Sequence, residues 1–587
     1  MGVPIEDNQE LGIKESRNSC FPTTETELLA MPSSSSNAGG TMDDCLLVIE
    51  LPEDDPLFEK KKKLLQDKGF APSECVKLQN ISGLDSLNVL LDSLLQRARI
   101  IHLNDFELYF GLMNLDQVQE LYSPRNEIEA LNFILSLVNL YIKKNSHENM
   151  AIPRDLRDAI IERIDNFGEK NKVKTRILKE ACDNEKQITR WADNCGVKSK
   201  LEIAYVEGAG RGALAAEDLG VGEIALEIPI SVIISEDLVY ESDMIHILET
   251  IEGISGETML LLWSMRERHN VNSKHKSYFD ALPEEFNTGL SFGIEAMMAL
   301  DETLASEEIF QAKEHLRCRY DELFPVLCDC YPDVFPPEFY TWEQYLWACE
   351  LWYSNSMRVM FPDGKLRTCL IPMAGFLNHS VYPHILHYGK VDSETNTLNF
   401  PLSRPCKKGE QCYLSYGCLA SSHLLTFYGF IPQELNPYDV IPLDIEATED
   451  CSFMEDYPAP DTTTHMLRGT WLSANQEIFY YGLPSPLLEH LRKVQSPGLR
   501  TMTQLQENLE NELRVLEDIR DIFDDMMEKL GGTEMDDREN PRHDVQLAIQ
   551  YKDLQRSIVS SILTACHSGR RIVELQLMKC MEEDVRG

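Results

Sequence analysis

Residues 402–430 read LSRPCKKGEQCYLSYGCLASSHLLTFYGF, and this stretch carries most of the information about the fold. Short strands are predicted around Leu370, Leu398 and Tyr413, where short apolar runs resume after a helical stretch. A single tyrosine after an apolar strand is most often a half-buried core aromatic. Two such residues, Tyr416 and Tyr428, follow here with LL and YGF between and after them. This combined spacing favours a functional interpretation.

Residues 201–229 read as strand, turn and strand. The run LEIAYV precedes the glycine-rich turn 208–212, which resembles the nucleotide-binding loop of Rossmann-like methyltransferases. A Rossmann loop must open a long helix, but a second turn at 218–222 follows almost at once. A new strand then runs from Ile224 to Pro229, where proline ends the ladder. The sequence therefore favours a β-rich unit over a βαβ unit.

Charge and hydropathy exclude two classes of partner. The 587-residue chain has a formal net charge of -42, from 55 Lys and Arg against 97 Asp and Glu, and 43% of its residues are hydrophobic. The negative electrostatic field of such a chain repels the phosphates of nucleic acids, so we expect no direct nucleic-acid binding. No run approaches the roughly 20 apolar residues that cross a bilayer, so we expect no membrane partner. A chain of this length is expected to form several domains.

The cysteines and the first residues bear on location and on metals. The 16 cysteines form no regular framework, and residues 1–20 lack the apolar run of a signal peptide and the Arg-rich, acid-poor composition of a transit peptide. We expect reduced thiols and an intracellular location, in the cytoplasm or nucleus rather than the chloroplast. Cys328 and Cys330 are not interpreted as a zinc site, because a further cysteine is missing and Pro332 intervenes. No metal is predicted.

Helical segments surround the β-rich unit. Residues 1–43 are rich in Ser, Thr, Asn and Gly and predict a disordered tail. Residues 44–195 predict a helical N-terminal domain with a packing or interaction role, and residues 238–351 predict a helical insertion. A further helical pattern runs from Pro484 to Glu582, with Gly531 and Gly532 as a stop signal. The apolar positions that carry the N-terminal pattern include Leu87, Leu90, Leu91, Leu94 and Leu95.

Five motifs in a fixed order resemble one family. They are GRGALAAEDLGVGEIALEIP (210–229), YFDALP (278–283), WEQYLWA (342–348), LIPMAGFLNHS (370–380) and YGCLASSHLLTFYGF (416–430). This order is typical of the SET-domain protein methyltransferases of the Rubisco large-subunit type. The resemblance implies an α+β multidomain chain. A β-rich SET domain at 196–435, with a pseudoknot and a helical insertion, would lie between helical N- and C-terminal domains.

The same resemblance extends beyond the motifs at one end of the chain. Residues 436–587, which include PLLEHLR at 486–492, are similar to the helical substrate-binding domain of that family. Residues 1–195 show no recognised counterpart. The implied partner is a protein substrate, and the sequence does not indicate an oligomeric state.

The resemblance assigns the candidate site residues and the cofactor S-adenosylmethionine. The expected cofactor-binding residues are Gly210, Arg211, Ser354, Asn355, Asn378 and His379. The turn at 210–211 would approach the cofactor by its main chain, which is a physical reason for glycine there. Tyr416 is the expected catalytic residue, and Tyr413 and Tyr428 are expected to line a substrate channel.

Methyl transfer suits these residue types. The reaction is an in-line displacement in which positive charge leaves sulfur, so the site needs orientation and carbonyl or phenol oxygens. Tyr416 would supply the phenol. A lysine acceptor must lose its proton first, and burial in an aromatic channel lowers its pKa. Aromatic walls also attract the cationic methylated product. The sequence therefore predicts a protein-lysine N-methyltransferase.

Three positions depart from the family pattern and leave alternatives open. Asn355 stands where the family commonly has Arg, Gly375 where it often has an acid, and Ser421 where it commonly has Asn. These changes favour a second possibility, a catalytically weak SET-like interaction module. Histidine is a third possibility as the acceptor, because a member of the same subfamily methylates a histidine of actin and no motif here separates the two acceptors.

Overall fold

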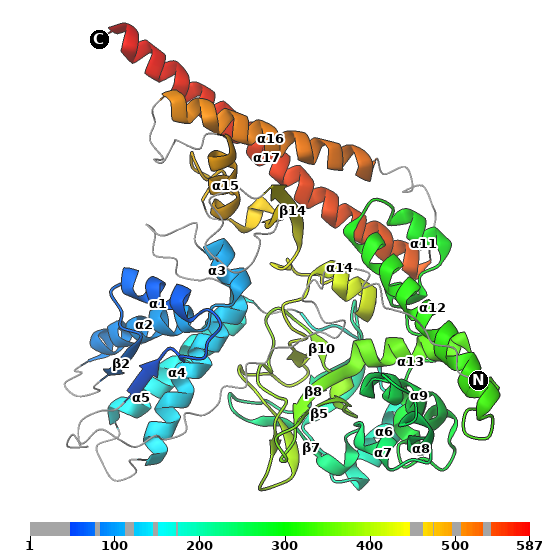
Figure 1. Ribbon diagram of the computed structural model, residues 1–587. Helices are drawn as coiled ribbons and strands as arrows, with labels where there is room; N and C mark the ends of the chain where they lie inside the picture. Colours follow the sequence, from blue (N-terminus) through cyan, green and yellow to red (C-terminus); the bar gives the residue numbers. More distant parts are fainter. Residues whose placement is uncertain are drawn as a thin grey trace.

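The structure is a computed structural model, and it describes residues 47–76, 83–111, 123–144, 151–171, 174–446, 462–473, 475–495, 506–531 and 542–586. The tail predicted at 1–43 lies outside these residues. Over the described ranges the chain is a mixed α+β protein with several small sheets and many helices, which confirms the predicted fold class (Figure 1). None of the described helices combines the length and the hydropathy needed to cross a bilayer.

The N-terminal region is a helical bundle with a small sheet. Strands β1 (Leu47–Glu50) and β2 (Ser73–Val76) pair antiparallel. The helices are α1 (Phe58–Asp67), α2 (Leu84–Ile101), α3 (Asp105–Gly111), α4 (Pro124–Lys144) and α5 (Ala151–Lys170). Their apolar faces form one core, which Tyr382 and Leu386 of the central region also enter. The predicted helical periodicity is therefore correct here, and the hairpin β1–β2 was not predicted.

The central region contains several short strands. Strands β3 (Ile177–Glu180), β5 (Leu201–Val206) and β6 (Gly210–Ala215) form one sheet, and helix α6 (Asp183–Asn194) lies between β3 and β5 in the chain. A second sheet has the order β11 (Val391–Asp392), β12 (Thr397–Pro401), β7 (Ile224–Pro229) and β4 (Lys198–Ser199). Strands β8 (Ser356–Met360) and β9 (Leu366–Leu370) form a separate hairpin. This β-rich arrangement agrees with the strands expected near Leu370 and Leu398.

One short parallel pair joins two of the sequence motifs. Strand β10 (Asn378–His379) pairs with β13 (Tyr413–Leu414), with Asn378 opposite Tyr413. Parallel strands require a crossover, and here the connection carries β11 and β12 on its way. After β13 the chain reaches α14 (Ser421–His423) and a wide helical turn, η6 (Leu424–Tyr428). This strand pairing places Asn378 and His379 beside the segment of chain that leads to Tyr416.

Helices interrupt the strands between β7 and β8. They are α7 (Asp237–Tyr240), α8 (Ile245–Leu248), α9 (Gly256–His269), α10 (Lys276–Ala281), α11 (Ile294–Ala299), α12 (Leu304–Cys330) and α13 (Trp342–Asn355). The helical insertion was predicted to end at 351, but α13 runs to Asn355. Ser354 and Asn355 are therefore the last residues of a helix whose buried face packs into the central core.

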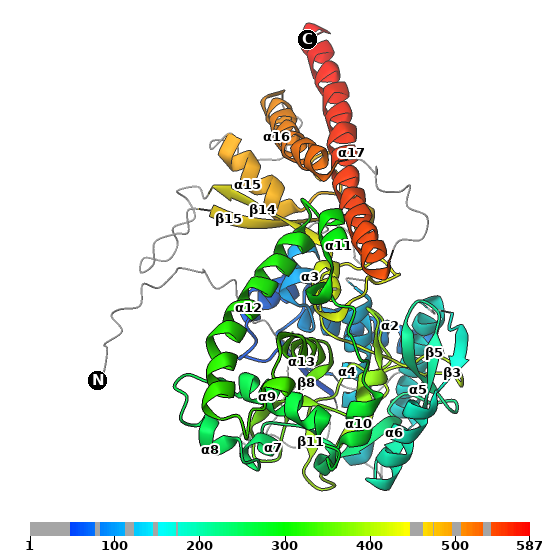
Figure 2. The ribbon, with the colours of Figure 1, turned by 90° about the vertical axis from the view of Figure 1, so that its right-hand side faces the viewer.

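The C-terminal region combines a hairpin with three helices. Strands β14 (Val440–Glu446) and β15 (Thr462–Arg468) pair antiparallel, and α15 (Ser485–Gln495), α16 (Gln506–Leu530) and α17 (His543–Arg586) follow. The stop expected at Gly531 is correct, because α16 ends at Leu530 and Gly531 has φ +67°. Helices α16 and α17 lie side by side, and the first turns of α17 pack on α11 (Figure 2). Helix α17 thus joins the C-terminal region to the insertion.

Candidate active site

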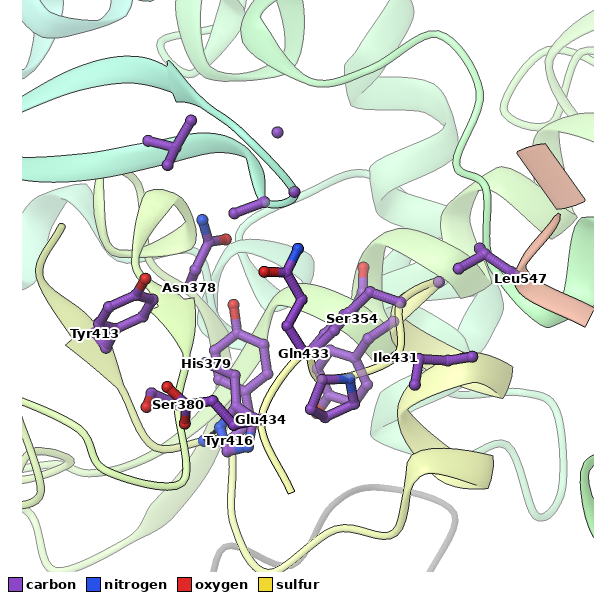
Figure 3. Close-up of a pocket in the computed structure, with 18 of the residues that line it drawn as sticks. Ser354, Asn378, His379, Ser380, Tyr413, Tyr416, Ile431, Gln433, Glu434 and Leu547 are labelled. Atoms are coloured by element: carbon purple, nitrogen blue, oxygen red, sulfur yellow. Dashed lines mark hydrogen bonds between the residues drawn. The ribbon is translucent and has the colours of Figure 1, made fainter. Parts of the chain in front are cut away.

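One cavity of about 1250 Å³ lies between the central strands and helix α17. It is lined by every residue that the sequence analysis selected: Gly210, Arg211, Ser354, Asn355, Asn378, His379, Tyr413, Tyr416 and Tyr428. These residues come from segments more than two hundred positions apart, and the strand pairings described above bring them together. Figure 3 shows the labelled side chains around this space, with Leu547 contributed by α17.

The glycine turn between β5 and β6 forms one wall of the cavity. Gly208 and Gly210 have φ +74° and +66°, in the left-handed region that glycine adopts without strain. A β-carbon on Gly208 would lie 1.9 Å from Nε2 of Gln433, so that side chain lies directly on the turn. A β-carbon on Gly210 would meet no atom within 4 Å. The turn is therefore closed at Gly208 and open at Gly210.

The Asn378 side chain is held to the same turn. Its Nδ2 donates to the carbonyl oxygen of Arg211 at 2.9 Å and to Oε1 of Gln411 at 3.3 Å. These two bonds fix the amide plane and therefore the direction of Oδ1. The Arg211 guanidinium points away toward the main-chain oxygen of Ala281 and the carboxylate of Glu185. Arg211 thus contacts Asn378 through its main chain.

His379 and Tyr416 are tied together by two contacts. The Tyr416 amide donates to Nδ1 of His379 at 3.0 Å, so a neutral ring carries its proton on Nε2. Their rings lie 5.2 Å apart between centroids. Burial lowers the pKa of His379 to about 4. The ring is therefore neutral near pH 7 and acts as a fixed support for the backbone of Tyr416.

Aromatic rings form the narrow part of the cavity. The Tyr416 hydroxyl donates to the carbonyl oxygen of Leu377 at 2.8 Å, and its ring stacks on Tyr428 with centroids 5.1 Å apart. Phe430 closes the edge, 6.5 Å from the Tyr416 ring. Burial raises the pKa of both tyrosine phenols above the usual value of about 10. Both phenols therefore stay protonated and can donate hydrogen bonds.

Two of the three departures from the family pattern lie side by side. Asn355 Nδ2 donates to Oγ of Ser354 at 2.8 Å, and Oγ of Ser354 donates to the carbonyl oxygen of Glu350 at 2.6 Å. Asn355 Oδ1 lies 3.0 Å from the position of a β-carbon on Gly375. The amide at 355 thus occupies part of the space that a side chain at 375 would need.

The third departure has a structural role outside the cavity wall. Ser421 is buried, its amide donates to Oδ1 of Asp439 at 2.6 Å, and its hydroxyl donates to Oδ2 at 2.9 Å. Burial raises the pKa of Asp439 to about 6. Ser421 therefore anchors the segment that follows the final motif to the start of α14. Ser421 itself does not line the cavity, whereas its partner Asp439 does.

Sequence reasoning missed part of the lining. Gln433 and Glu434 follow the final motif, and burial raises the pKa of the Glu434 carboxyl. Their location directly after YGF was the only available signal. The wall from the C-terminal region had no local signal, because it depends on where α17 docks. Its members are Trp471, Leu472, His543, Leu547, Gln550, Asp553, Leu554, Ser557 and Ile558.

A second cluster of reactive side chains lies next to β13. The imidazole of His384 and the thiols of Cys406 and Cys412 place one ligand atom each within 4.8 Å of one another. All three residues are fully buried. Within the described ranges, these three residues are the potential metal ligands that lie close enough together to hold an ion. The sequence analysis predicted no metal and did not single out these residues.

Solved structures share the architecture of this chain. The SET domain of Rubisco LSMT bound to lysine and AdoHcy superposes with a TM-score of 0.51 at 19% identity, covering 67% of this chain and 92% of that one. Rubisco LSMT bound to sinefungin and monomethyllysine gives a TM-score of 0.51 at 18% identity, with 69% and 98% covered. This chain has a SET-domain fold of the Rubisco LSMT type. The motif resemblance and the fold thus agree.

Curated relatives of this SET-domain chain are distant. SET domain-containing protein 4 of Mus musculus is 23% identical over 282 residues, which are 45% of this chain and 61% of that protein. The actin-histidine N-methyltransferase of Gallus gallus is 22% identical over 309 residues, 51% of each chain. The chain spans about half the length of the curated relatives it matches.

A family model adds information about the N-terminal region of the SET-domain chain. The model described as Rubisco LSMT substrate-binding matches residues 52–155. These residues cover α1 to α4 and the first turn of α5, in the bundle that packs on the SET region through Tyr382 and Leu386. The expectation that residues 1–195 have no counterpart is therefore wrong. The similarity expected for residues 436–587 stays a prediction.

Proposed function

We propose that this chain is an S-adenosylmethionine-dependent protein methyltransferase, with lysine as its acceptor. The main support is that the glycine turn at 210, the amide of Asn378 and the phenol of Tyr416 line one cavity. A cavity of about 1250 Å³ exceeds the roughly 300–1,000 Å³ of a typical small-molecule pocket, so it has room for a cofactor together with an acceptor side chain.

The residues present fit the cofactor. The open space at Gly210 and the oriented amide of Asn378 would hold its polar groups, and Ser354 and Asn355 line the same wall. S-adenosylmethionine would supply an electrophilic methyl group on sulfur. No cationic side chain replaces the Arg that the family commonly has at 355, so we expect weaker cofactor binding than that pattern gives.

The aromatic part of the cavity supports the chemistry. Tyr416, Tyr428 and Phe430 exclude water, which lowers the pKa of a lysine amine that enters and leaves its lone pair available. The protonated Tyr416 phenol and the Leu377 carbonyl orient the groups at the transfer point. The ring faces also attract a methylated ammonium product. Each of these effects acts on orientation and solvation, and none needs a metal-bound water.

Two observations support a protein as the substrate. The cavity extends along the face of α17, where apolar side chains of Leu547, Leu554 and Ile558 lie beside Asp553. Such a mixed groove suits an extended segment of a partner protein, with the acceptor side chain inserted toward Tyr416. The substrate-binding resemblance of residues 52–155 adds a second surface for the same partner. The proposed location of this protein is intracellular.

The direct test is methyl transfer by the full chain. Purified protein is incubated with a cell extract and a cofactor labelled in its methyl group, beside a Tyr416→Phe variant. We expect a discrete labelled band that is lost by about a hundredfold in the variant. Tyr340→Phe is the matched control, because its hydroxyl also donates to a carbonyl oxygen, that of Leu262 at 3.1 Å, within the helical insertion. Equal labelling by all three proteins would contradict the role of Tyr416.

Histidine is the second candidate acceptor, since the relatives at 22–23% identity include actin-histidine methyltransferases. Acid hydrolysis of the labelled band separates methyl-lysine from methyl-histidine, so one measurement decides between the two acceptors. A calorimetric titration with the cofactor tests the remaining alternative. Absence of both heat and thermal stabilisation at millimolar cofactor would favour an interaction module without catalysis.

A further inference from the structure

The cluster of His384, Cys406 and Cys412 has the residue types of a zinc site, but its hydrogen bonds do not suit one. The amide of Tyr413 donates to Nδ1 of His384 at 3.0 Å, so the neutral ring carries its proton on Nε2. A metal-ligating histidine normally donates its other ring N–H to an acceptor, whereas here that nitrogen is itself the acceptor. Coordination through Nε2 would require an anionic ring.

The nearest candidate for a fourth ligand is already engaged. The Glu410 carboxylate lies 3.6 Å from Nε2 of His384 and 3.9 Å from Nη1 of Arg404, whose side chain is buried. Closed structural zinc sites have four ligands, and only three ligand atoms converge here. Nε2 of His384 is buried and makes no hydrogen bond of good geometry among the described residues, although the Glu410 carboxylate and the Cys406 thiol both lie near it. A thiolate, formed when one of the two cysteines ionises, would accept a hydrogen bond from the Nε2–H group of His384.

The two thiols are held together by the backbone of one short loop. Cys406 exchanges main-chain hydrogen bonds with Leu219, at 3.0 and 2.9 Å, and the Cys412 amide donates to the carbonyl oxygen of Ala213 at 2.8 Å. The residues between the cysteines form a turn in which positions 407–409 are exposed. The buried thiols are thus covered by a single surface turn, which a small local opening would lift.

We propose that Cys406 and Cys412 form a reversible intramolecular disulfide, with hydrogen peroxide as the class of oxidant. The nearby S–H group of Cys412 and N–H group of His384 lower the pKa of the Cys406 thiol. Cys406 is therefore the first of the two thiols to ionise. Positive charge from Arg404 favours the same ionisation. The geometry of the pair, rather than the ionisation, identifies the site.

The reaction balances with one peroxide. The Cys406 thiolate attacks one peroxide oxygen, the O–O bond breaks, and the released hydroxide takes a proton to become water. The Cys412 sulfur then attacks the Cys406 sulfenic acid, the S–O bond breaks, and the second hydroxide leaves with the proton of Cys412 as water. Two thiols are oxidised to one disulfide, and the peroxide is reduced to two waters.

The bond would act on the candidate cofactor pocket. Gln411, which precedes Cys412, accepts from Asn378 at 3.3 Å, and Tyr413, which follows it, pairs with Asn378 between β13 and β10. Drawing Cys412 toward Cys406 moves both neighbours relative to Asn378. We expect oxidation to weaken cofactor binding by about tenfold, the effect of one lost hydrogen bond. This consequence rests on the proposed function, whereas the disulfide does not.

Peptide mapping tests the disulfide without any activity measurement. The reduced full chain is exposed to peroxide, quenched, alkylated in denaturant and digested. Trypsin cuts at Lys407 and Lys408, between the two cysteines, and chymotrypsin cuts at Tyr413 and Tyr416, which separates Cys412 from Cys418. We expect a linked peptide pair containing Cys406 and Cys412 that a dithiol reductant separates. Exposed Cys195 reports that oxidation took place.

Two results would overturn the proposal. One is recovery of Cys406 and Cys412 as alkylated thiols under conditions that oxidise Cys195. The other is one equivalent of zinc per chain in the purified protein that is lost on substitution of Cys406. A Cys412→Ala variant is expected to accumulate a sulfenic acid at Cys406 that dimedone captures. Cys369→Ala is the matched control, because it removes another fully buried thiol.

Discussion

Oδ1 of Asn355 lies 3.0 Å from the point where a β-carbon on Gly375 would stand. The two positions depart from the family pattern together, an Arg being replaced by Asn and an acid by Gly. In three dimensions they form one unit: the side chain at 355 covers the place left empty at 375. Their effects on stability and binding should therefore not add.

Gly375→Ala is expected to lower the free energy of unfolding by about 1 kcal/mol, because the added methyl is too close to Asn355 Oδ1. Combining it with Asn355→Ala should recover most of the loss, a coupling of about 0.5–1 kcal/mol. Urea unfolding of the four proteins measures it. The control is Gly220→Ala, where an added β-carbon meets nothing within 4 Å. Strictly additive losses would show that the two residues are independent.

The charged pair of the family can be restored in this chain. Asn355→Arg should strengthen cofactor binding, because it restores the cationic donor common in the family, whereas Gly375→Asp alone should weaken it, because the new side chain meets Oδ1 of Asn355. The double variant should bind about tenfold more tightly than either single variant. Calorimetric titration with S-adenosylmethionine provides the three affinities. A double variant no better than the weaker single variant would argue against a shared role.

Gly208 should be more sensitive to substitution than its φ alone requires. Gly208→Ala places a β-carbon 1.9 Å from Gln433 Nε2, so Gln433 must leave the cavity wall. Gly253 has a similar φ of +77° but meets nothing within 4 Å, so Gly253→Ala measures the backbone cost alone, about 1 kcal/mol. We expect Gly208→Ala to lose further stability and to weaken cofactor binding, in thermal-shift assays with and without cofactor. Equal effects at both glycines would mean that Gln433 moves freely.

Asp439 should make stability depend on pH in acidic solution. Burial raises the pKa of its carboxyl from 3.8 to about 6 in the folded chain. Between these values the folded state binds more protons than the unfolded state, so the free energy of unfolding falls as pH rises from about 4 to about 6 and is then level. Asp439→Asn should remove this slope while keeping an acceptor for the Ser421 amide. The difference between wild-type and variant melting temperatures from pH 4 to 7 checks the sign.

Tyr109 connects the N-terminal bundle to the C-terminal hairpin. Its hydroxyl shares a hydrogen bond with Nδ1 of His465 at 3.1 Å and accepts from the Met466 amide at 3.2 Å. Tyr109→Phe should cost about 1 kcal/mol and raise hydrogen exchange in α3 and β15 together. Tyr240→Phe, at a half-exposed position in α7, is the control. Exchange that rises in only one of the two segments would show that the contact does not couple them.

The site was predictable from sequence to the extent that it lies in contiguous motifs. Four of the site residues lie within or at the ends of short sequence motifs: Asn378, His379, Tyr416 and Tyr428. Their proximity in space could be predicted once the fold was recognised. The parallel pairing of Asn378 with Tyr413 was not readable, because a pair of two-residue strands leaves no periodicity. The same holds for Gln433, whose side chain reaches the turn across a loop.

The remaining differences arise from long-range packing. The helical insertion was expected to end at 351, but α13 continues to Asn355, with Trp352 and Tyr353 buried. The hairpin β14–β15 was not predicted, since the connection at 447–461 is much longer than the roughly two to five residues of a common hairpin loop. The α17 wall of the cavity depends on helix docking, which local patterns do not encode. The domain boundaries proposed from the sequence remain predictions.

The amide of Tyr416 occupies Nδ1 of His379, and the ring titrates near pH 4. That imidazole is therefore a poor Brønsted base at physiological pH and cannot shuttle protons for an incoming amine. Under the proposed function, the acceptor would have to lose its proton without help from His379. Turnover would then follow the acid–base equilibrium of the acceptor itself and quicken in alkaline buffer.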